Sequence, residues 1–324
     1  MTTSEKILTY IIKNRQASGK ELTDYLGDIS ARAVRKQLKN LLVKGLVAKI
    51  GRPPKVYYLL AKDKQLFDIS MVDEQTLRTI NDRYLYISPL GEAKYGWEGF
   101  ALWCEKTKQD SAKTASEYIE TLKKYDVFRK GDLIDGMYKM KSTFDEVFLD
   151  KLFYLDFYSI ERFGKTKLGQ LLLYAKQSQN KTLIRQLVDE IRAKTLKIVH
   201  ENKIDGVLYV PPTVKREVQF MKELENGLNL PIKTLSVVKV KTEIVVPQKT
   251  LSKLEDRVEN AKQTIIIDET GSYKNILLID DAVGSGATFN ETARQVRRKD
   301  IVNGKIIGLA MTGSFKGFDI ISEV

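Results

Sequence analysis

The sequence has almost no thiol or imidazole chemistry. It contains one cysteine, Cys104, and one histidine, His200, among 324 residues. A single cysteine excludes an intrachain disulfide and a zinc site built on cysteines. A single histidine argues against a histidine-based catalytic pair, and we expect His200 to be a surface residue near the end of a helix.

The sequence also lacks a long apolar run. No stretch approaches the roughly 20 apolar residues that a membrane-spanning helix needs, and the first residues lack the basic start and apolar core of a signal peptide. We therefore expect a cytoplasmic protein with no membrane partner. A hydrophobic content of 43% with 30% charged residues is typical of globular proteins, and the length allows two or three domains.

Positive charge is concentrated near the N-terminus. Residues 1–60 hold 12 Lys and Arg against four Asp and Glu. Their net charge of +8 is two thirds of the chain's net charge of +12. A basic segment of this kind favours a polyanionic partner.

The pattern of residues 1–62 predicts a winged helix-turn-helix domain. Apolar spacing predicts helices around 7–12, at 19–26 and at 31–44, and strands at 45–50 and 56–60 would form the wing. Such a domain implies contact with DNA or an RNA–DNA partner, whereas the alternative is protein contact or dimerisation. The expected nucleic-acid contacts are Arg32, Arg35, Lys36 and Lys39 on the third helix and Arg52 and Lys55 on the wing.

Residues 63–156 carry a weak pattern, from which we predict a mostly helical connecting region. Helices are expected at 99–106 and 111–124, and helical structure is also expected across the aromatic-rich stretch 125–157. Trp97 and Trp103 could stack a base, but we expect them to be buried in the core. This region shows no catalytic constellation.

From residue 157 the pattern becomes α/β. Helices are predicted at 167–176 and 180–196, and strands at 206–210, 274–280 and 305–311. The alternation predicts a parallel sheet with right-handed crossovers, and it places a ligand site at the carboxyl ends of the strands.

One stretch in this half, residues 275–288, carries the clearest chemistry. Its apolar run 276–279 predicts a strand buried on both faces, after which Asp280 and Asp281 should reach solvent. A small-residue loop, Gly284–Thr288, then leads into a segment of helical spacing. Backbone N–H groups in such a loop and at a helix start bind phosphate, and the carboxylates are placed to hold sugar hydroxyls.

This stretch differs from two common nucleotide motifs. It lacks the Gly-Lys-Ser/Thr of a Walker loop, and its glycines do not fit the Gly-x-Gly-x-x-Gly spacing. It resembles the phosphoribosyl diphosphate (PRPP) motif of type I phosphoribosyltransferases, in which an apolar strand precedes two acids and a small loop ending Gly-x-Thr. The alternative is an ordinary βα turn with an acidic N-terminus. We expect the hydroxyl of Thr288 to act at the N-terminal cap of the helix.

Three further stretches resemble the ComF-like branch of that family. They are the helix within 158–187, the strand and loop at 207–216, and a segment in which Gln248, Arg257 and Asn260 recur at the family's spacing. The resemblance covers residues 157–324. Two features depart from it: the zinc ribbon that often precedes ComF domains is absent, and the usual Gly-x-Asn does not follow Arg216.

The resemblance implies an α/β domain of the type I phosphoribosyltransferase kind at 157–324, behind the winged helix (1–62) and the connecting region (63–156). It also implies that a nucleophile displaces pyrophosphate from C1 of PRPP. The implied catalytic residues are Asp280, Asp281 and Arg216. The implied ligands of the 5′-phosphate are Val283, Gly284, Ser285, Gly286, Ala287 and Thr288. The implied pyrophosphate ligands are Pro212, Thr213, Lys215, Arg216 and Arg257. Mg²⁺ would bind with PRPP through the two aspartates, and no separate metal site is assigned. For Arg257, a surface position on a helix is the alternative.

Three classes of function remain open. The first is a nucleic-acid-associated phosphoribosyltransferase-like protein that binds PRPP or a related nucleotide sugar phosphate; its layout resembles accessory effectors of retron anti-phage systems, which implies phage defence. The second is a PRPP-sensing, DNA-binding regulator without catalysis, a layout that resembles purine-operon repressors. The third is a structural module with a decayed site, against which the retained acids and loop argue. We expect a homo-oligomer or a larger nucleoprotein complex.

Overall fold

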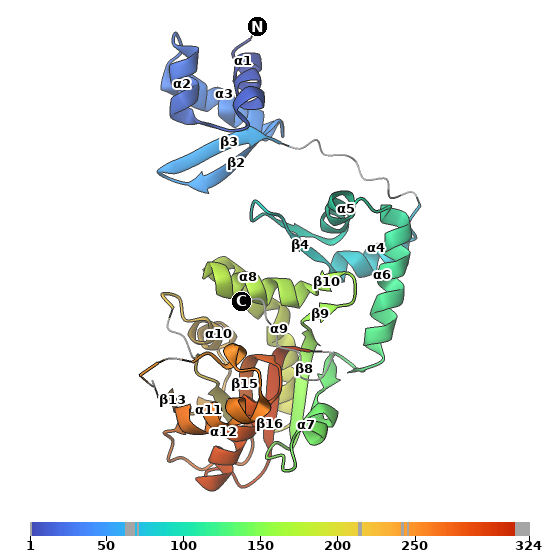
Figure 1. The fold of residues 1–324 in the computed structure, drawn as a ribbon, viewed down its shortest axis with the longest axis vertical. Helices are drawn as coiled ribbons and strands as arrows, with labels where there is room; N and C mark the ends of the chain where they lie inside the picture. Colours follow the sequence, from blue (N-terminus) through green and yellow to red (C-terminus); the bar gives the residue numbers. More distant parts are fainter. Residues whose placement is uncertain are drawn as a thin grey trace. The chain divides into compact units, whose positions relative to one another are not determined.

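The computed structural model describes residues 2–61, 69, 71–212, 216–240, 243–244 and 246–314. The chain divides into two compact units, one built on residues 2–61 and a larger one that holds most of residues 71–314 (Figure 1). Among the residues so described, no helix is long and apolar enough to cross a membrane.

The first unit combines three helices with a small antiparallel sheet. The helices are α1 (Thr3–Asn14), α2 (Gly19–Leu26) and α3 (Ala31–Val43). The strands β1 (Ala17–Ser18), β2 (Val47–Arg52) and β3 (Lys55–Leu60) pair in the order β1-β3-β2. The predicted helices are confirmed to within a few residues. Thr2, Ser18 and Ser30 each cap the start of a helix with the side-chain oxygen.

The core of this unit contains most of the apolar residues that predicted its helices. Ile7, Leu22 and Leu38 are buried there together with other apolar side chains of all three helices. Ile12 and Tyr25 are exceptions, with 62% and 51% of their surface exposed. The sequence pattern therefore located the helices correctly.

The second unit opens with a helical segment built around aromatic rings. It comprises α4 (Glu74–Arg83), the hairpin of β4 (Leu85–Ile87) and β5 (Ala93–Tyr95), α5 (Gly96–Lys106) and α6 (Ser111–Asp126). The ring of Trp97 stacks on Phe100 at 5.7 Å between centroids, and Trp103 contacts Phe163 at 5.6 Å. Trp97 is therefore buried, as expected, whereas Trp103 contacts core rings but is only partly buried, and the two predicted helices are confirmed.

The prediction of helical structure across 125–157 is wrong. This stretch forms β6 (Arg129–Lys130), β7 (Leu133–Asp135), the short helix α7 (Met137–Thr143) and β8 (Lys151–Phe157). Side chains on both faces of β8 are buried, so the strand lacks the alternation of apolar and polar residues by which strands are recognised in a sequence. The main sheet therefore includes residues that precede 157.

A seven-stranded sheet organises this unit, in the order β12-β11-β15-β16-β8-β7-β6. Its remaining strands are β11 (Gly206–Tyr209), β12 (Lys233–Thr234), β15 (Ile276–Val283) and β16 (Ile306–Gly313). The strands from β12 to β8 are parallel, and β7 and β6 continue the sheet antiparallel. The predicted α/β class with a largely parallel sheet is confirmed.

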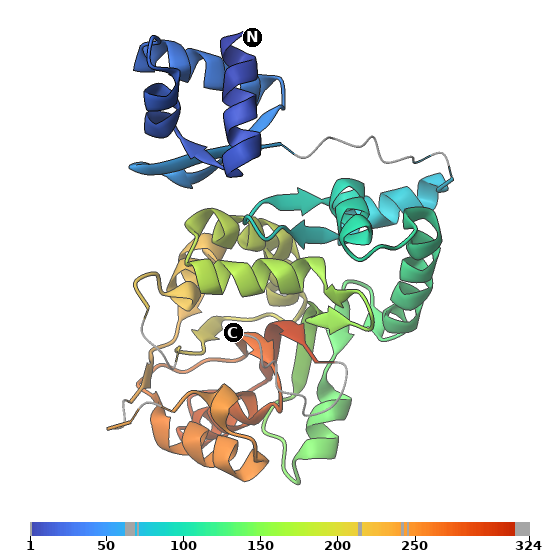
Figure 2. The same cartoon turned by 45° about the horizontal axis from the view of Figure 1, so that its top comes forward.

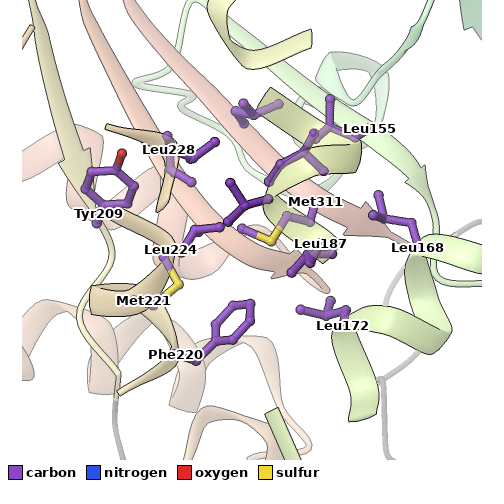
Figure 3. Close-up of a cluster of buried hydrophobic side chains, with 14 of the residues drawn as sticks. Leu155, Leu168, Leu172, Leu187, Tyr209, Phe220, Met221, Leu224, Leu228 and Met311 are labelled. Carbon is purple, nitrogen blue, oxygen red and sulfur yellow. The ribbon is translucent and has the colours of Figure 1, made fainter. Parts of the chain in front are cut away.

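Helices cover both faces of this sheet (Figure 2). One face carries α8 (Lys167–Ser178), α9 (Lys181–Glu201) and α10 (Phe220–Leu228). Figure 3 shows Leu172, Leu187 and Leu224 of these three helices meeting around Met311 of β16. The other face carries α12 (Ala287–Arg298), whose Phe289 lies over Gly308, where a Cβ would come within 3.0 Å of the ring.

Smaller elements surround the carboxyl edge of the sheet. The hairpin of β9 (Ser159–Ile160) and β10 (Gly164–Lys165) follows β8, and β13 (Val237–Lys239) pairs with β14 (Ile265–Ile267). Between these last two strands lie the turn η1 (Gln248–Thr250) and helix α11 (Leu254–Thr264). We call residues 247–264 the hood.

Candidate functional site

A cavity of about 310 Å³ lies at the carboxyl ends of β11 and β15. Its walls come from α8, the start of α10, the hood, and the loop that joins β15 to α12. This is where open parallel sheets place their ligands, and the volume is at the lower end of the range for small-molecule sites.

The phosphate and sugar residues predicted in the α/β half converge on this cavity wherever the structure describes them. The lining includes Pro212, Arg216, Arg257, Asp280, Asp281, Val283, Gly284, Ser285, Gly286, Ala287 and Thr288. Thr213 and Lys215 lie outside the described residues. Segments that are more than 60 positions apart in the chain therefore meet at one cavity, as the strand order requires.

The two aspartates lie inside β15 instead of after it, because the strand continues to Val283. The backbone N–H of Asp281 donates to Oδ1 of Asp280 at 2.8 Å. The carboxylate of Asp281 forms an ion pair with the ammonium of Lys176, which reaches it from α8. Both carboxylates are partly buried and line the cavity.

The environment of Asp280 disfavours its negative charge. Burial, and then the neighbouring charge of Asp281, raise the pKa of the Asp280 carboxyl to about 8, although Lys176 and Lys239 act in the opposite direction. Burial also lowers the pKa of Lys239, which comes from β13. Ionisation of Asp280 therefore costs free energy unless another cation or hydroxyl groups that donate hydrogen bonds bind to the carboxylate.

The loop after β15 turns into α12 at Gly286. This glycine is the N-cap residue and has φ +87°, and the hydroxyl of Ser285 accepts a hydrogen bond from the N–H of Ala287 at 3.3 Å. The expectation that Thr288 acts at the N-cap is wrong, because the left-handed glycine starts the helix two residues earlier. The N–H groups of the first helical turn have no partner inside a helix and are suited to an anion.

Helix α7 supports this loop. A Cβ on Gly286 would overlap Sδ of Met140 and would lie 3.5 Å from Cε2 of Phe144. Met140 is fully buried. Gly286 is therefore required both by its backbone conformation and by close packing.

Two lining cations were not among the predicted site residues. Lys176 is on α8 and Lys239 is on β13, and both line the cavity. The guanidinium of Arg216 donates to the carbonyl of Lys176, so Arg216, Lys176 and Asp281 form one connected group. Helical spacing places Lys176 on a helix but does not show that it faces Asp281, since that depends on the packing of α8 against the sheet.

The hood residues that resembled the family's spacing contact one another. Nε2 of Gln248 donates to the backbone carbonyl of Arg257 and to Oδ1 of Asn260, both at 3.0 Å. Arg257 is only 7% exposed, so the alternative of a surface arginine is wrong.

The predicted nucleic-acid residues of the first unit lie on its surface. Arg32, Arg35, Lys36 and Lys39 are exposed and border one hollow on α3. Arg52 and Lys55 are exposed register partners at the end of the β2–β3 hairpin. The structure thus gathers these cations in two places, and their contact with nucleic acid stays a prediction.

No protein-family model matches the sequence, and no curated protein matches it. The chain is similar to solved structures of an adenine phosphoribosyltransferase (14% identity, 43% of this chain and 74% of that chain, TM-score 0.27) and the adenine phosphoribosyltransferase of Leishmania tarentolae (12%, 44% and 87%, 0.27). A hypoxanthine phosphoribosyltransferase from Staphylococcus aureus is also similar (14%, 43% and 80%, 0.25). These TM-scores are low, and the likeness to these enzymes carries no functional conclusion. None of the three matches concerns a winged helix, ComF or a retron.

Replacement of Gly286 tests the construction of the loop. Gly286→Ala should lower the free energy of unfolding by about 1–3 kcal/mol, because the new Cβ meets Met140 and the backbone is left-handed. Gly284→Ala is the matched control, since the nearest atom to its Cβ is Nη1 of Arg257 at 3.6 Å. Urea unfolding measures both; equal stability of the two variants would contradict the packing described for α7.

The raised pKa of Asp280 makes a prediction about pH. An acid whose pKa is higher in the folded state destabilises the fold once ionised, so stability is lost as pH rises from about 4 toward 8. The free energy of unfolding of Asp280→Asn should therefore equal that of the wild type near pH 4. At pH 8 it should be higher by about 1–3 kcal/mol, a range that allows for the partial exposure of the carboxyl. Chemical unfolding across this range, with exposed Asp268→Asn as control, measures the difference. A pH-independent difference would contradict the assigned environment.

Proposed function

We propose that the cavity binds PRPP or a related nucleotide sugar phosphate, in a domain of the type I phosphoribosyltransferase kind with ComF-like features. One observation supports this most strongly. The aspartate pair of β15, the small-residue loop before α12 and several cationic side chains line a single cavity at the carboxyl edge of the sheet.

The charges of the cavity suit such a ligand. Among the described lining residues, four cations (Lys176, Arg216, Lys239 and Arg257) share the cavity with the two aspartates. PRPP carries a phosphate at one end, a pyrophosphate at the other and two ribose hydroxyls between them. Cations and N–H groups complement the phosphates, and the carboxylates accept hydrogen bonds from the hydroxyls.

Each part of the proposed site has a distinct role. Gly284–Thr288 hold a phosphate with backbone N–H groups, and Asp280 and Asp281 hold the ribose hydroxyls. Arg216 and Lys176, which are already in contact, face the pyrophosphate. Lys176 must release Asp281 when the ligand binds, so its charge becomes available to the pyrophosphate at that moment.

The residues present are compatible with Mg²⁺ that arrives with PRPP. In the described part of the chain, no three His, Cys, Asp or Glu side chains group into a metal site. Mg²⁺ is commonly held by one or two carboxylates together with phosphate oxygens and water, and Asp280 and Asp281 supply such a pair. When bound, the ion neutralises charge on the pyrophosphate.

The proposed reaction class is displacement at C1 of the ribose. The bond from C1 to the pyrophosphate oxygen breaks, its electron pair leaves with pyrophosphate, and an acceptor nucleophile forms a new bond to C1. The part of the chain in this step is to position the ligand and stabilise its charge. The alternative function, a PRPP sensor, uses the same binding without displacement.

The first unit is part of the same proposal. Its three helices and β2–β3 hairpin have the element order of a winged helix-turn-helix, and exposed cations gather on α3 and at the hairpin end. We infer a nucleic-acid-associated effector whose layout suits phage defence; the alternative is a DNA-binding regulator that responds to PRPP.

Asp281 provides the test of the binding proposal. Asp281→Asn should weaken PRPP binding in the presence of Mg²⁺ by at least about tenfold, since it removes a charged hydrogen-bond acceptor. Exposed Asp145→Asn serves as control, and calorimetric titration measures both. Pyrophosphate release that depends on an added acceptor supports the enzyme, whereas binding without release, with altered DNA affinity, supports the sensor. Wild-type PRPP affinity in Asp281→Asn would show that the acids are misassigned.

The nucleic-acid proposal has its own test. The double variant Arg35→Ala/Lys36→Ala should bind DNA or an RNA–DNA duplex more weakly and reduce the salt slope of log K by about two, one per lost phosphate contact. Lys6→Ala/Lys13→Ala on α1 removes the same charge elsewhere and is the matched control. Equal losses of nucleic-acid affinity in the two double variants would show that only net charge matters and would argue against a recognition helix.

A further inference from the structure

Arg257 is a buried cation with unused hydrogen-bonding capacity. Only 7% of its surface is exposed, and its Nε donates to the backbone carbonyl of Leu251 at 2.7 Å. Its Nη2 is buried and has no hydrogen-bond partner among the residues that the structure describes. A buried donor on a charged group is costly when unpaired, so such an atom indicates a missing acceptor.

The guanidinium points to the loop that precedes α12. Its Nη1 lies 3.6 Å from the position of a Cβ on Gly284. Helix α11, which carries Arg257 in its first turn, packs against α12, whose N-terminus is formed by this loop. Gln248 fixes the backbone of Arg257 from the other side of the hood.

Arg216 has a different environment within the same cavity. Its guanidinium contacts the carbonyl of Lys176, and Lys176 pairs with Asp281. Arg216 and Lys176 thus form one cationic group beside α8, and Arg257 of the hood is a second cation beside Gly284. The two groups are placed to bind different parts of a ligand.

The geometry points to Arg257 as a ligand of the phosphate monoester held by Gly284–Thr288, and not as a pyrophosphate ligand. A guanidinium offers two Nη groups in a plane, which match two oxygens of one phosphate. Backbone N–H groups bind many kinds of anion. The full positive charge of Arg257 would strengthen the binding of a doubly charged phosphate much more than that of a neutral sugar. This inference rests on the proposed function only in taking the phosphate to be the 5′-phosphate of PRPP.

The cost of the ligand-free arrangement fits this assignment. Burial lowers the pKa of Arg257, because it removes the charge from water. A phosphate held by Gly284–Thr288 would supply a counter-charge to this guanidinium. Arg257 therefore contributes to the site when the phosphate binds, while Leu251 and Gln248 hold it in place beforehand.

The experiment compares fragments of the proposed ligand. Ribose 5-phosphate and inorganic pyrophosphate are titrated separately into the wild type, Arg257→Gln, Arg257→Lys and Arg216→Gln by calorimetry. Arg257→Gln should lower the affinity for ribose 5-phosphate by about 10- to 100-fold and the affinity for pyrophosphate by less than about threefold. Arg257→Lys should fall between, because it keeps the charge and loses the paired geometry. Arg216→Gln should show the reverse preference.

Either of two results in these fragment titrations would overturn the inference. One is a loss of pyrophosphate affinity in Arg257→Gln with ribose 5-phosphate unchanged. The other is an equal loss of both ligands together with a lower unfolding temperature in Arg257→Lys, which would indicate a structural role.

Failure of the proposed function gives a separate result. If the wild type binds inorganic phosphate or a nucleoside monophosphate through Arg257 but binds neither PRPP nor ribose 5-phosphate, the inference stands and the PRPP proposal fails. If the wild type binds PRPP and every Arg257 variant binds it equally well, the proposed function stands and the inference fails.

Discussion

Two adjacent carboxylates at the end of a buried parallel strand are the constraint on which the site depends. Burial, and then the charge of Asp281, raise the pKa of Asp280, and Lys176 is paired with Asp281. A fold under selection for stability alone would place apolar residues there. The pair is therefore best explained by a ligand that brings hydroxyl groups or a cation to it.

The rest of the unit holds this strand end in position. Parallel neighbours β11 and β16 fix β15 on both sides, and helices on both faces bury it. Close packing then sets the loop, because Gly286 rests on Met140 of α7 and the hood places Arg257 beside Gly284. Helix α7, the hood and the sheet thus meet at the loop between β15 and α12.

Local sequence patterns predicted the parts of this arrangement that local physics controls. The apolar run of β15, its acids and the glycine loop are visible because a buried strand and a tight turn need those residue types in that order. Strand β8 was missed because burial on both faces removes the alternation that marks strands. Lys176, Lys239 and the burial of Arg257 could not be predicted, since each depends on how distant segments pack. Helix spacing finds a helix, but only tertiary packing decides which of its charged residues faces a cavity.

The most direct measurement of the central claim is a crystal structure with ribose 5-phosphate bound. The account predicts phosphate density within hydrogen-bonding distance of the backbone N–H groups of Gly284–Thr288, with the ribose hydroxyls on Asp280 and Asp281 and the Lys176–Asp281 ion pair broken. Density for the ligand at another place on the protein, with Lys176 still paired to Asp281, would contradict it.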